Sequence, residues 1–290
     1  MKRIALFASI AMFCILLFGR TPKTETSQIV ATTLPVYEFS KGLCEGTELK
    51  VTQLITEDIS CLHDYTLQVS QMQKLEKAEV LIVSGAGLET FLEDVSAEVP
   101  TVIDVSKDIA LISANCEHED HHHDDDVDPH YWLSPKYAAK MCKNIYNSLL
   151  EIYPEYASTF AKNQKELDAK FDQLGFYAEE NLGNLSCRQI ITFHDGFQYM
   201  AEAFNLEIVH ALEEESGREA SAGELIALSQ LVEEFNLPAI FTEKNGSTSA
   251  ASVVASEADV KVFSLDMAMS AESYFSAMYH NINTLKEALG

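Results

Sequence analysis

Short apolar runs alternate with helix-like stretches in two separate parts of this 290-residue chain. Each run is bounded by turn-forming residues, which is typical of strands buried in a parallel sheet. The predicted strands are residues 29–35, 49–55, 80–83 and 101–105 in the first part and 189–193, 206–210, 239–242 and 260–265 in the second. The predicted helices are residues 36–44, 66–77, 87–96, 197–204, 221–235, 247–257 and 271–289. This alternation predicts an α/β fold with two pseudo-symmetric lobes, each a mainly parallel sheet flanked by helices.

Two long helical segments separate these parts. Ser134 and Pro135 suit the N-cap and first position of a helix to about residue 152, and Pro154 begins another to about residue 182. The second helix has one narrow apolar stripe, formed by Phe160, Leu167, Phe171, Leu174 and Ala178. At about 1.5 Å per residue it would span roughly 40 Å, enough to link two lobes. We therefore expect a leader at 1–27, an N-terminal lobe at 28–152, a linking helix at 153–184 and a C-terminal lobe at 185–290.

The chain begins with the pattern of an export signal. Lys2 and Arg3 precede an apolar run at residues 4–18, and residues 21–27 are polar. The run is shorter than the roughly 20 residues of a stable membrane span, and whether it is cleaved or kept as an anchor stays open. Cys14 lacks the small preceding residue expected of a lipid-modified cysteine. We expect an exported protein that is soluble beyond this signal.

The charge balance excludes one large class of partners. Asp and Glu number 45 against 20 Lys and Arg, whereas nucleic-acid binding requires basic patches that neutralise phosphates. The acidity is either an ordinary solvated surface or a negative field that concentrates cations. No CxxC pair is present, so neither a zinc ribbon nor a thioredoxin motif is predicted. The disulfide pattern stays open among the cysteines after the signal, namely Cys44, Cys61, Cys116, Cys142 and Cys187.

Residues 116–128 form a stretch rich in histidine and carboxylate. Mixed imidazole and carboxylate ligands suit divalent transition metals. The stretch is too polar to bury apolar surface, so we expect it to lack fixed structure without metal. Its histidines are interpreted as an auxiliary, weaker metal site, with a solvated charge run as the alternative: His118, His121, His122 and His123.

Four candidate metal ligands fall where predicted strands end or in the loops that follow them. Ligands bind beyond the carboxyl ends of parallel strands because the loops converge there. Three imidazoles and one carboxylate suit a tetrahedral zinc site, and the candidates are His63, His130, His194 and Asp266. Glu243 also ends a strand and is either a carboxylate that orients a ligand imidazole or an ordinary solvated side chain.

The chain resembles the zinc and manganese substrate-binding proteins of bacterial ABC importers, the group that includes high-affinity zinc-uptake proteins and adhesin-like lipoproteins. The resemblance covers nearly all of the chain after residue 28. It rests on the segments His63-Asp-Tyr-Thr-Leu-Gln68, Asp128-Pro-His-Tyr-Trp-Leu-Ser-Pro135, Thr192-Phe-His-Asp-Gly-Phe197, Phe241-Thr-Glu243 and Leu265-Asp266. It implies that His63, His130, His194 and Asp266 bind the metal, and that a long helix joins two lobes that hold the ion between them.

The resemblance also bears on the metal. A histidine-rich loop ahead of the Asp-Pro-His motif is typical of the zinc-importing branch, whereas manganese-binding relatives usually have glutamate where His194 stands. Residues 58–62 depart from the Pro/Gly-rich turn of the family, so Cys61 is an alternative extra thiolate ligand. The lipid-attachment cysteine of the Gram-positive relatives is missing.

The resemblance implies a metal-binding receptor and not an enzyme. We expect a monomeric receptor, periplasmic or attached to the bacterial cell surface, that captures Zn²⁺ and passes it to an ABC permease in the cytoplasmic membrane. Four protein ligands would leave no open position for an activated water. The alternatives are a manganese or iron receptor of the same family and, in a different class, an exported zinc-dependent hydrolase with Glu243 as general base.

Overall fold

The structure is a computed structural model that describes residues 28–59, 62, 65–113, 127–212 and 220–290. Several sequence predictions lie outside these residues. They are the signal at 1–27, the proposed ligand His63, the alternative ligand Cys61 and the loop histidines His118, His121, His122 and His123.

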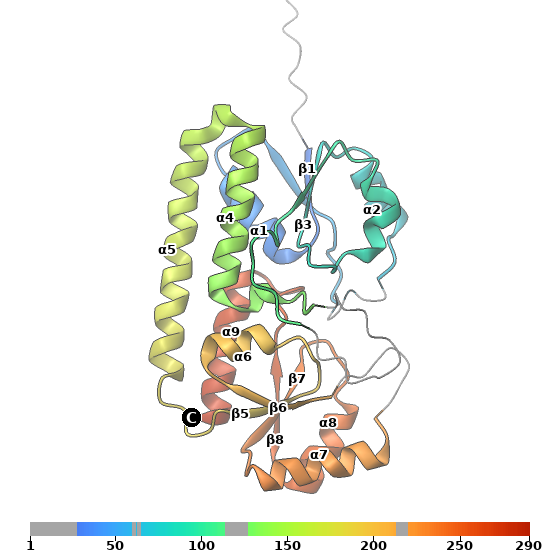
Figure 1. The fold of residues 1–290 in the computed structure, drawn as a ribbon, viewed down its shortest axis with the longest axis vertical. Coiled ribbons are helices and arrows are strands. Elements are labelled where there is room, and N and C mark those ends of the chain that lie inside the picture. The colour runs from blue at the N-terminus through green and yellow to red at the C-terminus, as the bar shows by residue number, and fades with distance from the viewer. Residues whose placement is uncertain (1–27, 60–61, 63–64, 114–126, 213–219) are drawn as a thin grey trace, which may run out of the picture.

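The N-terminal part contains a parallel four-stranded sheet in the order β2-β1-β3-β4. Figure 1 shows α1 (Leu34–Cys44), α4 (Pro135–Ile152) and α5 (Ala157–Leu182) on one side of this sheet and α2 (Val69–Leu75) on the other. Burial on both sides explains the continuous apolar runs of the two central strands β1 and β3, whereas the edge strands β2 and β4 are partly exposed. The strands are β1 (Gln28–Ala31), β2 (Lys50–Gln53), β3 (Val80–Val83) and β4 (Thr101–Asp104).

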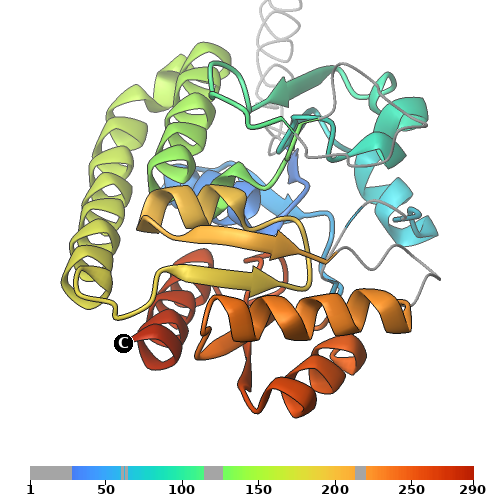
Figure 2. The same cartoon turned by 60° about the horizontal axis from the view of Figure 1, so that its bottom comes forward.

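The C-terminal part repeats this arrangement with the strand order β6-β5-β7-β8, again parallel. Ile190 and Phe241 face the core shared with the N-terminal part, whereas their neighbours Ile191 and Ile240 face a second cluster under α7 and α8 (Figure 2). Successive residues point to opposite faces of a strand, so both faces are covered. The strands are β5 (Gln189–Thr192), β6 (Glu207–Ala211), β7 (Ala239–Glu243) and β8 (Lys261–Leu265).

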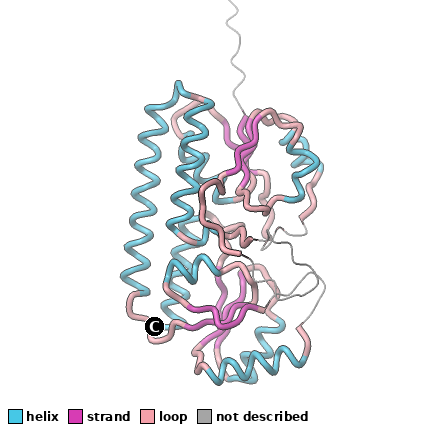
Figure 3. Tube along the Cα trace, in the orientation of Figure 1, coloured by secondary structure: helices cyan, strands magenta, loops and turns pink. Residues whose placement is uncertain are grey.

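Four helices hold the two sheets together around one hydrophobic core. The helix α5 (Ala157–Leu182) packs against α1 (Leu34–Cys44), α4 (Pro135–Ile152) and α9 (Tyr274–Leu289). Its 26 residues span about 39 Å at 1.5 Å per residue, and it runs alongside both sheets (Figures 1 and 3). The predicted stripe from Phe160 to Ala178 is buried.

The remaining helices are α2 (Val69–Leu75), α3 (Glu93–Ser96), α6 (Gln198–Phe204), α7 (Ala222–Glu234) and α8 (Ser249–Ala258). Short 3-10 turns occupy Thr90–Leu92, Tyr131–Leu133 and Pro154–Tyr156. The predicted capping box at the start of α7 is confirmed, because Glu224 accepts from the Ser221 backbone and donates to its hydroxyl through its own N–H. Ser134 occupies the N-cap of α4 before Pro135, but its side chain makes no capping bond.

The predicted helix at 87–96 is wrong over its first half. Gly85, Ala86 and Gly87 have φ angles of 78°, 55° and 77°. Three successive residues with positive φ cannot start a right-handed helix. The chain therefore turns there, and only a 3-10 turn and the single-turn α3 follow.

The turn before α3 surrounds a buried carboxylate, Glu89. Its oxygens accept hydrogen bonds from the Thr32 hydroxyl at 2.6 Å and from the backbone N–H groups of Ser84 at 2.7 Å and Gly85 at 3.0 Å. Burial raises the pKa of Glu89 above its ordinary value, although these donors oppose the shift. The side chain thus ties the ends of β1 and β3 together.

We predict that Glu89→Gln changes how stability depends on pH. Because the pKa of Glu89 is raised, its contribution to stability is present at low pH and is lost as pH rises through the folded-state pKa. Glutamine does not titrate, so the free energy of unfolding of E89Q relative to the wild type should rise as the pH is raised from about 4, near the unfolded-state pKa, through the folded-state pKa. Urea denaturation at each pH measures it. A difference that stays constant across this range would contradict the raised pKa.

Candidate metal centre

His130 is buried in the segment before α4, which lies between the two sheets (Figure 1). The Asp128 carboxylate oxygen Oδ1 accepts the backbone N–H of His130 and lies 2.8 Å from the ring atom Nδ1. A carboxylate beside Nδ1 favours the tautomer with the proton on that nitrogen. In that tautomer the other ring nitrogen, Nε2, carries the lone pair that can bind a metal ion.

Asp128 is itself held in place by the C-terminal part. The hydroxyl of Tyr199, on α6, donates to the Asp128 backbone carbonyl at 2.9 Å and accepts the Ile112 N–H at 2.8 Å. Burial raises the pKa of Tyr199 to about 12, so the hydroxyl keeps its proton and remains a donor at neutral pH. The orientation of His130 therefore depends on residues from both parts of the chain.

His194 lies just beyond β5, with its ring centroid 5.5 Å from that of His130. Its Nδ1 atom is 3.9 Å from the Glu243 oxygen Oε2 at the end of β7. That separation is an ion-pair distance and too long for a hydrogen bond. The structure therefore brings two predicted ligands together and places Glu243 where it can orient one of them.

Gly196 allows the two imidazoles to approach. A Cβ atom at this position would lie 2.8 Å from His194 Nε2, 2.9 Å from His130 Nδ1 and 2.6 Å from the Met267 methyl carbon. These separations are shorter than real side chains tolerate. Only glycine fits here without moving both rings.

Asp266, directly after β8, is fixed in place by hydrogen bonds to its backbone. The buried Asn281 side chain of α9 accepts the Asp266 N–H at 2.7 Å and donates to the Asp266 carbonyl at 2.8 Å. In the carboxylate, Oδ1 accepts the Ala268 N–H at 2.8 Å, and Oδ2 lies 2.9 Å from the Lys244 ammonium. The carboxylate is buried, and two partners compensate its charge.

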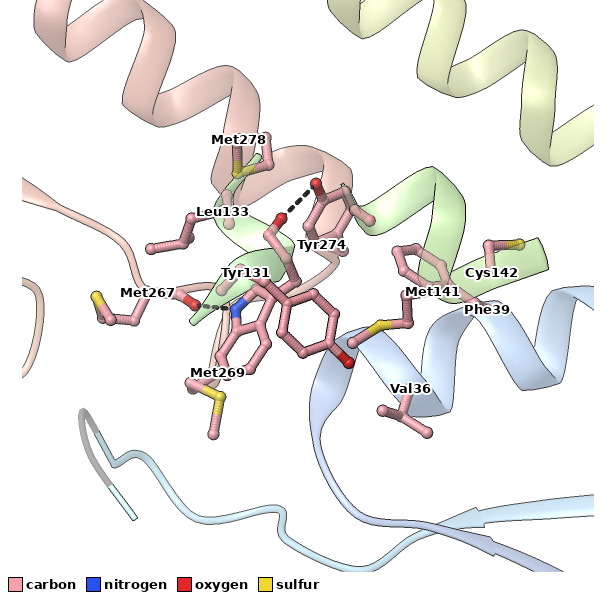
Figure 4. Close-up of a cluster of buried hydrophobic side chains, with 14 of the residues drawn as sticks. Val36, Phe39, Tyr131, Leu133, Met141, Cys142, Met267, Met269, Tyr274 and Met278 are labelled. Carbon is pink, nitrogen blue, oxygen red and sulfur yellow. Dashed lines mark hydrogen bonds between the residues drawn. The ribbon is translucent and has the colours of Figure 1, made fainter. Parts of the chain in front are cut away.

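A hydrogen bond joins the His130 segment to the Asp266 segment. The indole N–H of Trp132 donates to the Met267 carbonyl at 2.9 Å, and the Tyr274 hydroxyl donates to the Trp132 carbonyl at 2.9 Å (Figure 4). Both rings are fully buried. The two segments therefore keep a fixed spacing through this pair of bonds.

The described residues supply only part of the predicted ligand set. Among them, no three His, Cys, Asp or Glu side chains are close enough together to hold a metal ion. The rings of His130 and His194 lie side by side. Asp266 directly precedes Met267, whose methyl carbon lies next to Gly196 together with both rings. His63 is not among the described residues. The imidazole of His280 lies elsewhere, 3.3 Å from the Ser264 carbonyl.

Asp128, Gly196, Lys244 and Asn281 were not predicted as part of the site. Asp128 and Gly196 lie inside the quoted Asp-Pro-His and Phe-His-Asp-Gly segments, so their proximity to a ligand in sequence was an available signal. Lys244 follows Glu243 directly, but its partner Asp266 is 22 residues away. Asn281 is 15 residues from Asp266 and reaches it only through the packing of α9 on β8.

A family model described as "Zinc-uptake complex component A periplasmic" matches residues 29–288. The chain belongs to this family. Within the described residues of this member of the zinc-uptake component A family, no helix has the length and apolar character needed to cross a membrane.

The chain is similar to curated proteins of two genera. It is 29% identical to the zinc-binding lipoprotein AdcA of Streptococcus pneumoniae, over 99% of this chain and 61% of AdcA. It is 27% identical to the high-affinity zinc uptake system protein ZnuA of Bacillus subtilis, over 92% of this chain and 89% of that protein. The chain thus spans about three fifths of the length of AdcA.

Solved structures of zinc-bound relatives share the fold. A ZnuA variant that lacks residues 138–173, with zinc bound, superposes with a TM-score of 0.77 at 25% identity, over 92% of this chain and 99% of that one. Zn(II)-bound AdcA from Streptococcus pneumoniae superposes with a TM-score of 0.76 at 28% identity, over 91% of this chain and 58% of that one. The predicted two-lobed α/β fold is confirmed.

We predict that Gly196→Ala weakens zinc binding by at least about tenfold, as loss of ligand orientation does at metal sites. The added methyl group must displace both imidazoles. Gly175→Ala is the matched control, because a Cβ at Gly175 in α5 would meet no atom within 4 Å. Competition titration against a zinc chelator measures both variants. Equal zinc affinity in G196A and G175A would show that the two rings do not form the site.

Proposed function

We propose that the protein is an extracytoplasmic zinc receptor that delivers Zn²⁺ to an ABC importer. The observation that carries this proposal is the pair His130 and His194, whose rings meet while a carboxylate faces Nδ1 of each. Such carboxylates orient metal-binding imidazoles and raise their basicity. The family and the printed names of its zinc-binding and zinc-uptake relatives support the same conclusion.

The proposed ligands are His63, His130, His194 and Asp266, with Glu243 orienting His194. Three nitrogens and one oxygen complete a tetrahedral zinc sphere. The loop histidines His118, His121, His122 and His123 form a separate, weaker site. In this proposal residues 28–152 and 185–290 are the two lobes, residues 153–184 link them, and residues 1–27 are the export signal.

The proposed receptor is not an enzyme. A zinc hydrolase needs an open coordination position for water and a general base beside it. Glu243, the candidate base, faces the Nδ1 atom of His194, which suits a role in orienting that ring. Zinc is favoured over manganese because imidazole-rich ligand sets suit zinc, whereas manganese prefers oxygen ligands.

The proposed partner is an ABC permease in the cytoplasmic membrane. The receptor would act as a monomer in the periplasm or at the cell surface, where it captures the ion that the permease transports. Transport complementation in a bacterium that lacks its own zinc receptor tests this step, with growth in chelator-treated medium as the readout.

We predict that His194→Ala lowers zinc affinity by at least about a hundredfold, because it removes one of four ligands from a preformed site. His280→Ala is the control, since that imidazole lies exposed on α9. Deletion of residues 118–126 should leave one tightly bound zinc per chain. Metal analysis and chelator competition measure these values. Three results would contradict the proposal. They are loss of all tightly bound zinc when the loop is deleted, tighter binding of manganese than of zinc, and hydrolysis of an ester or peptide that depends on added zinc.

A further inference from the structure

Lys244 extends from the end of β7 directly beside the end of β8. Its backbone N–H donates to the Leu265 carbonyl at 2.7 Å, so the two strand ends are fixed to each other. The Glu243 carboxylate faces His194, whereas the Lys244 ammonium, in the turn that follows β7, reaches the Asp266 oxygen Oδ2 at 2.9 Å.

The two members of this ion pair differ in their freedom to move. Asp266 is held by Asn281 at both backbone groups and by Ala268 at Oδ1, and its side chain is only 5% exposed. The Lys244 side chain is 47% exposed on a flexible four-carbon stem. If the pair separates, the lysine moves into solvent and the carboxylate stays in place.

We propose that Lys244 is a built-in competitor of zinc that limits affinity and speeds release. Without metal, the ammonium compensates the buried Asp266 carboxylate, which would otherwise be costly to keep charged. A zinc ion at Oδ2 carries two positive charges and repels the ammonium at this distance, so Lys244 must leave. Its return to Oδ2 favours departure of the ion. This inference rests on the proposed role of Asp266 as a zinc ligand.

A competitor of this kind suits a receptor that must release its ion. A site that holds zinc too tightly cannot pass it on, and a tethered cation weakens the bound state without removing a ligand. Because Lys244 follows the neighbouring strand β7, its ammonium can pair with the Asp266 carboxylate whenever that carboxylate dissociates from the metal. The lysine therefore lowers the affinity that the ligand residues supply, and the ligand residues also determine which metal binds.

Lys244→Met tests the inference because it keeps the length of the stem and removes the charge. We expect zinc to bind about two- to fivefold more tightly, a change of the size that a partly exposed ion pair supplies. The dissociation rate, measured by rapid mixing with a chelator, should fall by a similar factor. Lys244→Arg should stay near the wild type, and Lys244→Gln gives a second neutral variant that checks the result against misfolding.

Lys162→Met is the control for overall charge, since Lys162 pairs with Glu166 on the exposed surface of α5. It should leave zinc affinity and dissociation unchanged. Unchanged or weaker zinc binding in K244M and K244Q, with wild-type zinc stoichiometry, would overturn the inference. So would an equal gain in K162M, which would mean that net charge alone sets the affinity.

A double-mutant cycle with Asp266→Asn isolates the pair. In the D266N background, K244M should no longer tighten zinc binding, because the carboxylate for which the ammonium competes is absent. Weak binding by D266N together with no effect of K244M in the wild-type background would overturn only the role of Lys244. Wild-type affinity in D266N would instead show that Asp266 is not a ligand, and both the ligand set and this inference would fail.

Discussion

The hydrogen bond from the Trp132 indole to the Met267 carbonyl holds together the segments that carry His130 and Asp266. Trp132 belongs to the segment that opens α4, and Met267 follows β8, so the bond joins the two parts of the chain at the site. The Tyr274 hydroxyl, from the start of α9, fixes the Trp132 carbonyl in turn. Because all three residues are buried, water does not compete for these bonds. The spacing of the proposed ligands is therefore set by the shared core.

Buried or nearly buried carboxylates surround the site, and each has a different partner. Asp128 faces an imidazole, Asp266 faces an ammonium and a backbone N–H, and Glu243 faces the second imidazole. A buried carboxylate without a partner would be neutral or strongly destabilising. The partners thus keep negative charge in the site before any cation arrives, and that charge attracts a divalent metal ion.

Much of the fold could be predicted from the sequence because the strands fall in short, mainly apolar runs between turn residues, and the central strands β1, β3, β5 and β7 are largely buried. The eight strands, the long helix α5 and the capping box at Ser221 were all anticipated within a few residues. The helix expected at 87–96 failed over its first half because Gly87 and the two residues before it adopt positive φ, which residue identity alone did not reveal at Ala86. The contact between His130 and His194 followed from their place at strand ends and in the loop before α4.

The residues that orient the ligands could not be predicted in the same way. Asn281 and Lys244 act on Asp266 through the packing of α9 on β8 and through the adjacency of β7 and β8. No periodic pattern in the sequence indicates either contact, because each contact depends on which helices and strands become neighbours in the fold. The place of His63, which lies outside the described residues, stays a prediction.

The proposed zinc site is tested most directly by identifying the atoms that coordinate the metal. Zinc K-edge X-ray absorption on the protein loaded with one zinc per chain measures the identity of the ligand atoms and their distances. We predict three imidazole nitrogens and one oxygen at about 2.0–2.2 Å. A sulfur ligand at about 2.3 Å, as Cys61 would supply, or fewer than three imidazoles would contradict the proposed set of His63, His130, His194 and Asp266.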